Sequence, residues 1–183
     1  MSKIFQTVAN SKPLLITAGI IELLSIVEMT RRTEYLHSTF DPPFDPPDLW
    51  FGIPEEKLYY YLDEIGDGGR EAYRRMNSWD LFPYMETYMI LCGALLFLQC
   101  RSANMYDVSW IFIITMLCDI VESGTFNYAL NRYPEHLSSA IISAASIANQ
   151  MKWISFGIGG VILVGLFINN HLLGRSKAKV HQE

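Results

Sequence analysis

Two carboxylates, Asp119 and Glu122, stand inside an apolar stretch that is long enough to cross a bilayer, and they restrict the possible folds of this chain severely. A carboxylate at membrane depth costs roughly 2.5–3.5 kcal/mol on insertion scales. Because the two residues are three positions apart, they lie on one face of a helix. A chain that keeps both has to enclose them, which predicts an integral membrane protein with a polar interior.

Four apolar segments have the length of membrane spans, at about residues 13–30, 81–100, 108–130 and 138–170. In lipid every backbone amide needs an internal partner, so packed helices are the expected form. The prediction is a single all-α membrane domain over residues 1–183, a four-transmembrane-helix bundle with an extramembrane loop at 31–79. Glu22 and Glu28 interrupt the first segment, which favours a retained span over a cleaved signal peptide.

The composition excludes several classes of function. Only 18% of the residues are charged, against about 25% in soluble proteins. The formal net charge of −5 argues against nucleic acid as a partner, because phosphate backbones need a basic surface. The three cysteines form no CxxC pair, and the four histidines lie outside or at the edges of the spans. No cofactor and no metal are therefore predicted, and membrane lipid is an expected partner.

The loop between the first two spans carries a tandem repeat, Phe-Asp-Pro-Pro, at residues 40–43 and 44–47. Repeated Pro-Pro favours an extended polyproline II path, which can lie along a partner at little entropic cost. The loop is either a surface for another membrane protein subunit or a stiff spacer. The candidate partner-binding residues are Phe40, Pro42, Pro43, Phe44, Pro46, Pro47, Trp50 and Phe51.

A short helix is predicted from Pro54 to Ile65, because Leu58, Leu62 and Ile65 recur at helical spacing and Gly66 ends the pattern. Three consecutive tyrosines, at 59–61, give it an aromatic flank suited to the headgroup region. The expectation is an interfacial helix between the first and second spans. Further along, Pro83 predicts a kink at the start of the second span.

Polar residues recur within the spans at positions that favour a shared interior. Lys152 in the fourth span could offset the charges of Asp119 and Glu122 in the third. One interpretation is a structural network that fixes helix packing, and the other is a proton relay or a polar substrate pocket. The predicted polar core consists of Asp80, Asp119, Glu122, Ser146, Asn149, Gln150 and Lys152.

Several short motifs resemble those of a widespread family of small four-helix membrane proteins. The motifs are Gly69-Arg70-Glu71-Ala72-Tyr73, Asp80-Leu81-Phe82-Pro83, Asp119-x-x-Glu122, Tyr133-Pro134, Ala145-Ser146 and Lys152-Trp153, and the family pattern reads G-R-x-x-Y, D-x-F-P, D-x-x-E-N, Y-P and A-S-x-x-T-x-x-K-W. The resemblance covers roughly residues 55–155. It implies the bundle and its polar core but no reaction. Ser123 and Asn149 depart from the pattern, where the family has Asn and Thr, and these changes could remove a ligand contact.

Two classes of function remain. The first is a non-catalytic accessory or assembly subunit of a larger membrane complex. Respiratory-chain and ATP-synthase complexes of the mitochondrial inner membrane are the first expectation, because such assemblies hold many small membrane subunits. The alternative is a small membrane enzyme, such as a lipid or sterol isomerase, or a proton-coupled carrier. Its catalytic residues would be Asp119, Glu122 and Lys152. A lipid-sized pocket at the carboxylates would separate the enzyme from the subunit.

Overall fold

The computed structural model describes residues 2–39 and 45–173, and the regular elements in this part of the chain are helices, with no strand. In chain order they are α1 (Ser2–Ala9), α2 (Lys12–Thr39), the short turn η1 (Pro47–Leu49), α3 (Glu55–Glu64), α4 (Gly66–Trp79), the irregular turn η2 (Asp80–Tyr84), α5 (Met85–Ser102), α6 (Ile111–Arg132), α7 (Ser139–Ile168) and the final turn η3 (Asn169–Leu173).

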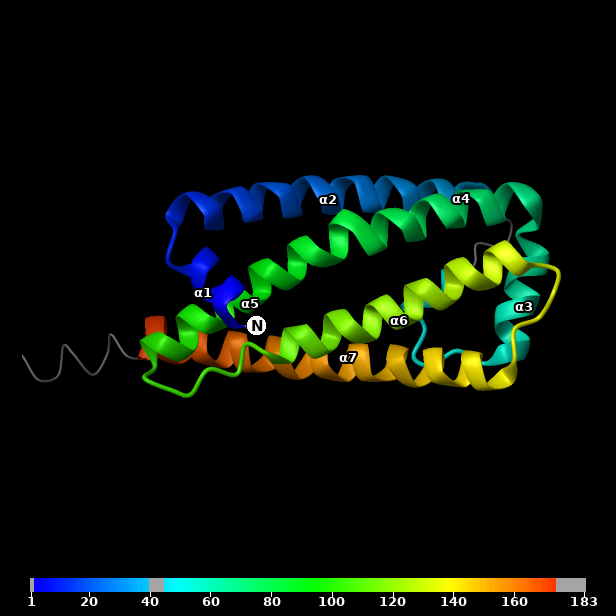
Figure 1. Ribbon diagram of the computed structural model, residues 1–183. Helices are drawn as coiled ribbons and strands as arrows, with labels where there is room; N and C mark the ends of the chain where they lie inside the picture. Colours follow the sequence, from blue (N-terminus) through cyan, green and yellow to red (C-terminus); the bar gives the residue numbers. More distant parts are fainter. Residues whose placement is uncertain (1, 40–44, 174–183) are drawn as a thin grey trace, which may run out of the picture.

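Four helical segments are long and apolar enough to cross a membrane, which confirms the predicted four-helix bundle. They are Lys12–Ser38, Gly66–Ser102, Ile111–Arg132 and Ser139–His171. Figure 1 shows α2 along one edge of the bundle, α7 along the opposite edge, and α5 and α6 between them. Large apolar side chains of α2 and α7 project outward, among them Leu23, Leu24, Val161 and Val164. An apolar outer surface of this kind is what lipid contact requires.

The second span is interrupted at η2, as the position of Pro83 predicts. Phe82 leaves the helical conformation, with φ −158° and ψ 124°, and Pro83 has no N–H to donate. In Figure 1 α4 runs beside α2, whereas α5 diverges from α2 toward the end that holds α1. Asp80 and Tyr84, at the two ends of η2, both line the interior.

An aromatic cluster fills the end of the bundle that α3 crosses (Figure 1). Tyr61 meets Tyr73 edge-on at 5.7 Å between ring centroids, and Tyr73 lies 6.1 Å from Phe126 of α6. The predicted helix at 54–65 is therefore present, but the expected aromatic flank for headgroups is wrong for Tyr59 and Tyr61. Both are buried because their face of α3 turns toward the bundle.

A second apolar cluster fills the opposite end, and it depends on α1, which the sequence analysis did not predict. The buried members are Phe5, Met85, Met89, Leu96, Cys100 and Phe112. Phe5 packs on Gly93, where an added Cβ would lie 2.6 Å from the ring. Along α6, Asp119 and Glu122 fall between Phe112 of this cluster and Phe126 of the aromatic cluster. The polar residues of the interior thus lie between two apolar ends.

Candidate functional site

The segment after the proline repeat is bound to the side of α7. The Gly52 N–H donates to Asn149 Oδ1 at 2.6 Å, and the Ile53 N–H donates to Ser146 Oγ at 2.8 Å. Trp153 Nε1 donates to the Trp50 carbonyl at 3.0 Å. Gly52 has φ +86°, a conformation that favours glycine. This part of the predicted extramembrane loop therefore forms one wall of the bundle interior.

Lys152 joins α7 to α6 through two carboxylates. Its Nζ lies 2.6 Å from Glu122 Oε2 and 3.4 Å from Asp119 Oδ1. Asn149 Nδ2 donates to the other oxygen of Glu122 at 2.9 Å. All four side chains are buried. The structure thus brings together the three charged residues for which the sequence predicts a common interior.

Asp119 connects this ion pair to the second span and the loop. Its Oδ2 accepts a hydrogen bond from the Tyr88 hydroxyl of α5 at 2.9 Å. Lys152 Nζ also donates to the backbone carbonyl of Asp48 at 3.5 Å. Elements from four parts of the chain therefore meet at Asp119 and Lys152.

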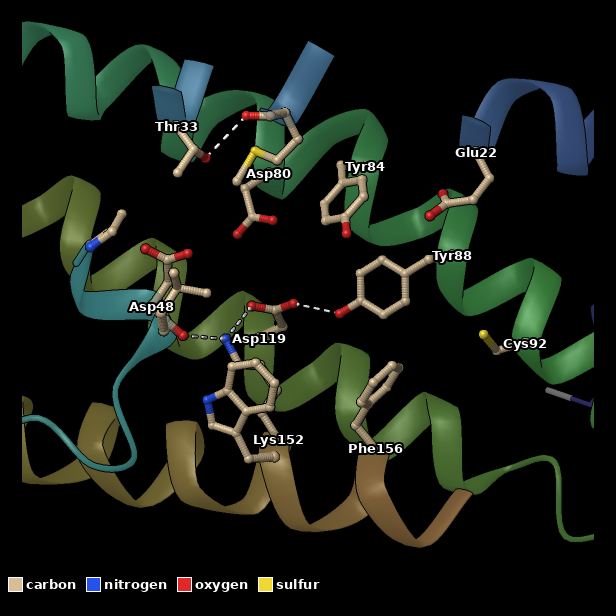
Figure 2. Close-up of a pocket in the computed structure, with 14 residues that line it drawn as sticks. Glu22, Thr33, Asp48, Asp80, Tyr84, Tyr88, Cys92, Asp119, Lys152 and Phe156 are labelled. Atoms are coloured by element: carbon tan, nitrogen blue, oxygen red, sulfur yellow. Dashed lines mark hydrogen bonds and ion pairs between the residues drawn. The ribbon is translucent and has the colours of Figure 1, made fainter. Parts of the chain in front are cut away.

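A cavity of about 350 Å³ opens beside these residues (Figure 2). This volume lies within the range of small-molecule sites, roughly 300–1,000 Å³. Its walls come from α2, the loop, η2, α5, α6 and α7. The lining residues are Glu22, Met29, Thr33, Pro46, Asp48, Leu49, Asp80, Tyr84, Tyr88, Cys92, Asp119, Lys152, Trp153 and Phe156. Lys152 forms part of the wall and leaves this space open.

Asp48 reaches the cavity from the loop and has an unsatisfied oxygen. The residue is 7% exposed, and its Oδ1 has no hydrogen-bond partner among the described residues. Burial raises the pKa of Asp48 to about 6 from an ordinary value of 3.8, although the nearby Lys152 charge acts in the opposite direction.

The other two carboxylates of the wall differ in their partners. Glu22 Oε2 accepts a hydrogen bond from Thr87 at 2.7 Å, which accounts for an acidic group on α2 within the interior. Asp80 is 7% exposed, and within the described chain its carboxylate accepts no hydrogen bond and forms no ion pair. Asp80 is therefore free to interact with a molecule in the cavity.

The structure separates the predicted polar core into three groups. Asp119 and Lys152 line the cavity, as does Asp80. Glu122 and Asn149 are fully buried behind the wall. Ser146 binds the loop backbone, and the half-buried Gln150 lies beside Gly52, where an added Cβ would be 2.8 Å from its Nε2.

The predicted partner-binding residues do not form one surface among the described residues. Pro46 lines the cavity, Pro47 is buried, and Trp50 packs edge-on against Tyr61 at 5.9 Å. Phe51 is 66% exposed. The remaining members, Phe40, Pro42, Pro43 and Phe44, lie outside the described residues.

Sequence reasoning did not include Asp48, Tyr84 and Tyr88 among the site residues. Tyr84 and Tyr88 stand four and eight positions after Asp80, a spacing that would place the three on one face of an uninterrupted helix. Asp48 could have been singled out in the sequence as an acidic residue that stands between Pro46-Pro47 and the apolar residues Leu49 to Ile53.

Comparison with models of protein families, with curated proteins and with solved structures finds no match to this chain. The resemblance to the four-helix family thus stays a prediction.

The geometry supplies the elements of acid–base chemistry. Asp119 has a cation beside one oxygen and accepts a hydrogen bond from a hydroxyl on the other. Asp80 has neither. Two carboxyl groups of different environment on one cavity form a pair suited to accept and to supply a proton.

Proposed function

We propose that this protein binds a lipid-soluble small molecule in the cavity between its helices and catalyses a proton transfer on it, as a double-bond isomerase does. The observation that carries the proposal is the cavity of about 350 Å³ that opens onto Asp119, Asp80 and Lys152. A purely structural ion-pair network needs no such space. The many apolar side chains on the outer surface of the helices favour a substrate that reaches the site from the membrane.

An isomerisation of this kind adds a proton to one carbon of a double bond and removes a proton from a neighbouring carbon. The double bond moves, and no oxidant or second reagent is consumed. Asp119 then releases its proton to water and Asp80 recovers one from water, which restores the starting state. Asp119 is the base, because Lys152 and Tyr88 hold its two oxygens in place at the cavity wall. Asp80 is the acid, because it is buried at the cavity wall and no described residue donates a hydrogen bond to its carboxyl group. Glu122 is assigned to positioning Lys152 rather than to catalysis.

The test begins with the full chain, purified in mild detergent with the molecules that it retains. Native mass spectrometry should find a bound lipid-soluble molecule in stoichiometric amount. Incubated with fresh protein in D₂O, this molecule should take up deuterium at carbon. The variant Asp119→Asn should bind the molecule but lose the uptake. Uptake that persists in this variant contradicts the assigned base.

A cavity-filling variant tests binding separately from chemistry. Cys92→Trp places a large ring in the cavity, so the bound molecule should be lost. Ile158→Trp is the matched control, because Ile158 lies on the exposed outer face of α7 and its replacement leaves the cavity unchanged. A wild-type protein that retains no molecule, or equal retention by the two variants, overturns the proposed site.

Membership in a larger complex is a second proposal, and the exposed Phe51 favours it. Trp50 and Ile53 on either side are held by α7, so the Phe51 ring is displayed in a fixed position. A subunit of a respiratory-chain or ATP-synthase complex in the mitochondrial inner membrane fits this proposal. Phe51→Ser should leave the bundle folded and lower the recovery of such a complex with the protein. Unchanged co-purification contradicts the role of this surface.

A further inference from the structure

The wall of the cavity carries more negative than positive groups. Four carboxylates line it, from Glu22, Asp48, Asp80 and Asp119, whereas Lys152 is the one cationic side chain among the described lining residues. Buried carboxylates without counter-charges are strongly unfavourable, so these groups either keep a proton or take a cationic partner.

Lys152 cannot supply that compensation to the whole wall. Its Nζ is closer to Glu122, at 2.6 Å, than to Asp119, at 3.4 Å, and Glu122 lies behind the cavity wall. The single positive charge is therefore shared among Glu122, Asp119 and the backbone carbonyl of Asp48. Neither Asp48 nor Asp80 forms an ion pair within the described chain, although the charge of Lys152 acts on both.

Asp48 provides a separate indication of a missing ligand. The loop that carries it is bound to α7 at Gly52 and Ile53, so the residue is held in place by backbone hydrogen bonds. Its unpartnered Oδ1 is nevertheless buried at the cavity wall. A buried acceptor without a donor costs roughly 1–3 kcal/mol, which a ligand bearing a donor would recover.

The rest of the wall is aromatic and apolar. The ring centroids of Tyr84 and Tyr88 are 5.3 Å apart, and Tyr88 meets Phe156 edge-on with 5.9 Å between ring centroids. Figure 2 shows Asp48 and Asp80 at one end of the cavity and Cys92 with Phe156 at the other. Aromatic faces attract organic cations as well as apolar groups.

From these features we infer that the cavity takes an amphipathic cation, a lipid-soluble molecule with a protonated amine or ammonium group between Asp48, Asp80 and Asp119 and an apolar body toward Cys92 and Phe156. The inference rests on the proposed function only in requiring that the cavity is a ligand site. It also agrees with the proposed reaction, because protonation of a double bond creates positive charge beside the carboxylates.

The experiment compares two probes of equal shape, amantadine and adamantanol, on the full chain in nanodiscs. Amantadine carries an ammonium group where adamantanol carries a hydroxyl. Binding is measured by the shift of the unfolding temperature and by native mass spectrometry. Wild type should bind amantadine at least about tenfold more tightly than adamantanol.

Variants locate the source of the preference. Asp48→Asn and Asp80→Asn keep the shape of the wall and remove one charge each, so each should reduce the preference by about tenfold. Glu56→Gln is the matched control, because it removes one negative charge at an exposed position of α3 that does not line this cavity. It should retain the preference for the amine.

Equal binding of the two probes, or a preference that survives in both Asn variants, overturns the inference. So does stabilisation by sodium ions alone that amantadine does not increase. If a neutral lipid is retained and amantadine is not bound, the cationic ligand is wrong and the proposed ligand site stands. If neither a lipid nor a probe is bound, the ligand site itself is wrong.

Discussion

Glu122 and Asp80 are both acidic residues of the bundle interior, yet their surroundings differ. Glu122 has an ammonium group at 2.6 Å and an amide donor at 2.9 Å. Asp80 faces an open cavity without either kind of partner in the described chain. Both are nearly inaccessible to solvent, so burial alone does not distinguish them. For these two residues, a counter-charge away from the cavity indicates a structural carboxylate, and a cavity without a bonded partner indicates one that is available to a ligand.

The largest loss of stability is expected from removing Lys152, the cation that pairs with Glu122. Lys152→Met leaves Glu122 and Asp119 buried without compensation, so the free energy of unfolding should fall by about 3–5 kcal/mol. Thermal unfolding in detergent measures the loss. Adding Glu122→Gln should recover part of it, and Ile154→Met on the exposed face of α7 should have little effect. Wild-type stability of Lys152→Met would mean that the ion pair contributes nothing.

Asp48, whose Oδ1 has no hydrogen-bond partner among the described residues, should make the stability of the fold depend on pH. The pKa of Asp48 is about 6 in the fold and 3.8 ordinarily, so the folded state holds the proton more tightly. This contribution to stability is complete below about pH 4 and is lost as the pH rises through 6, by at most about 3 kcal/mol. Chemical unfolding across this range measures it.

The control for the pH effect is a variant without the titrating group. Asp48→Asn should remove the slope, whereas Glu56→Gln, at an exposed position of α3, should retain it. Lys152, Asp119 and Asp80 also face Asp48, so the slope that disappears in Asp48→Asn is the relevant quantity. An unchanged slope in that variant would assign the titration to another group.

A smaller loss of stability is expected from a change at Gly52, in the loop segment that is hydrogen-bonded to α7. Gly52→Ala places a Cβ at φ +86° and 2.8 Å from Gln150 Nε2, so the free energy of unfolding should fall by about 1–2 kcal/mol. Gly68→Ala is the control, because an added Cβ there meets no other atom within 4 Å. Equal stability of the two variants would show that the loop adapts without strain.

The smallest effect should follow neutralisation of the unpaired carboxylate. Asp80→Asn removes a buried carboxyl group that has no hydrogen-bond or ion-pair partner, so stability should be unchanged or higher by about 1 kcal/mol. Glu122→Gln removes a paired charge and should lower the free energy of unfolding by about 1–3 kcal/mol. If the two variants are equally destabilised, the distinction between paired and unpaired carboxylates does not hold.

The helices and the ion pair could be predicted because each follows from local spacing and membrane depth. The apolar runs have the length of spans, and Asp119 and Glu122 share a face at three-residue separation. Lys152 is the natural counter-charge because it lies in another span. Pro83 likewise marks the kink through its missing N–H.

The cavity could not be predicted, because it depends on a path of the chain that tertiary contacts decide. Asp48 lies in a loop whose course is fixed by hydrogen bonds to Asn149 and Ser146, nearly a hundred residues later. Tyr59 and Tyr61 resemble headgroup anchors in sequence, but they pack inside because α3 crosses the end of the bundle.

The ion pair between α6 and α7 has a consequence for biosynthesis. The α6 segment is the least apolar of the four candidate spans and carries both Asp119 and Glu122, whereas their cation lies on α7. Entering lipid alone, α6 would bear two uncompensated carboxylates, at roughly 2.5–3.5 kcal/mol each. Residues 133–138 join the two helices closely. Insertion of α6 and α7 together, as a helical hairpin already neutralised by Lys152, is therefore the favourable route into the membrane.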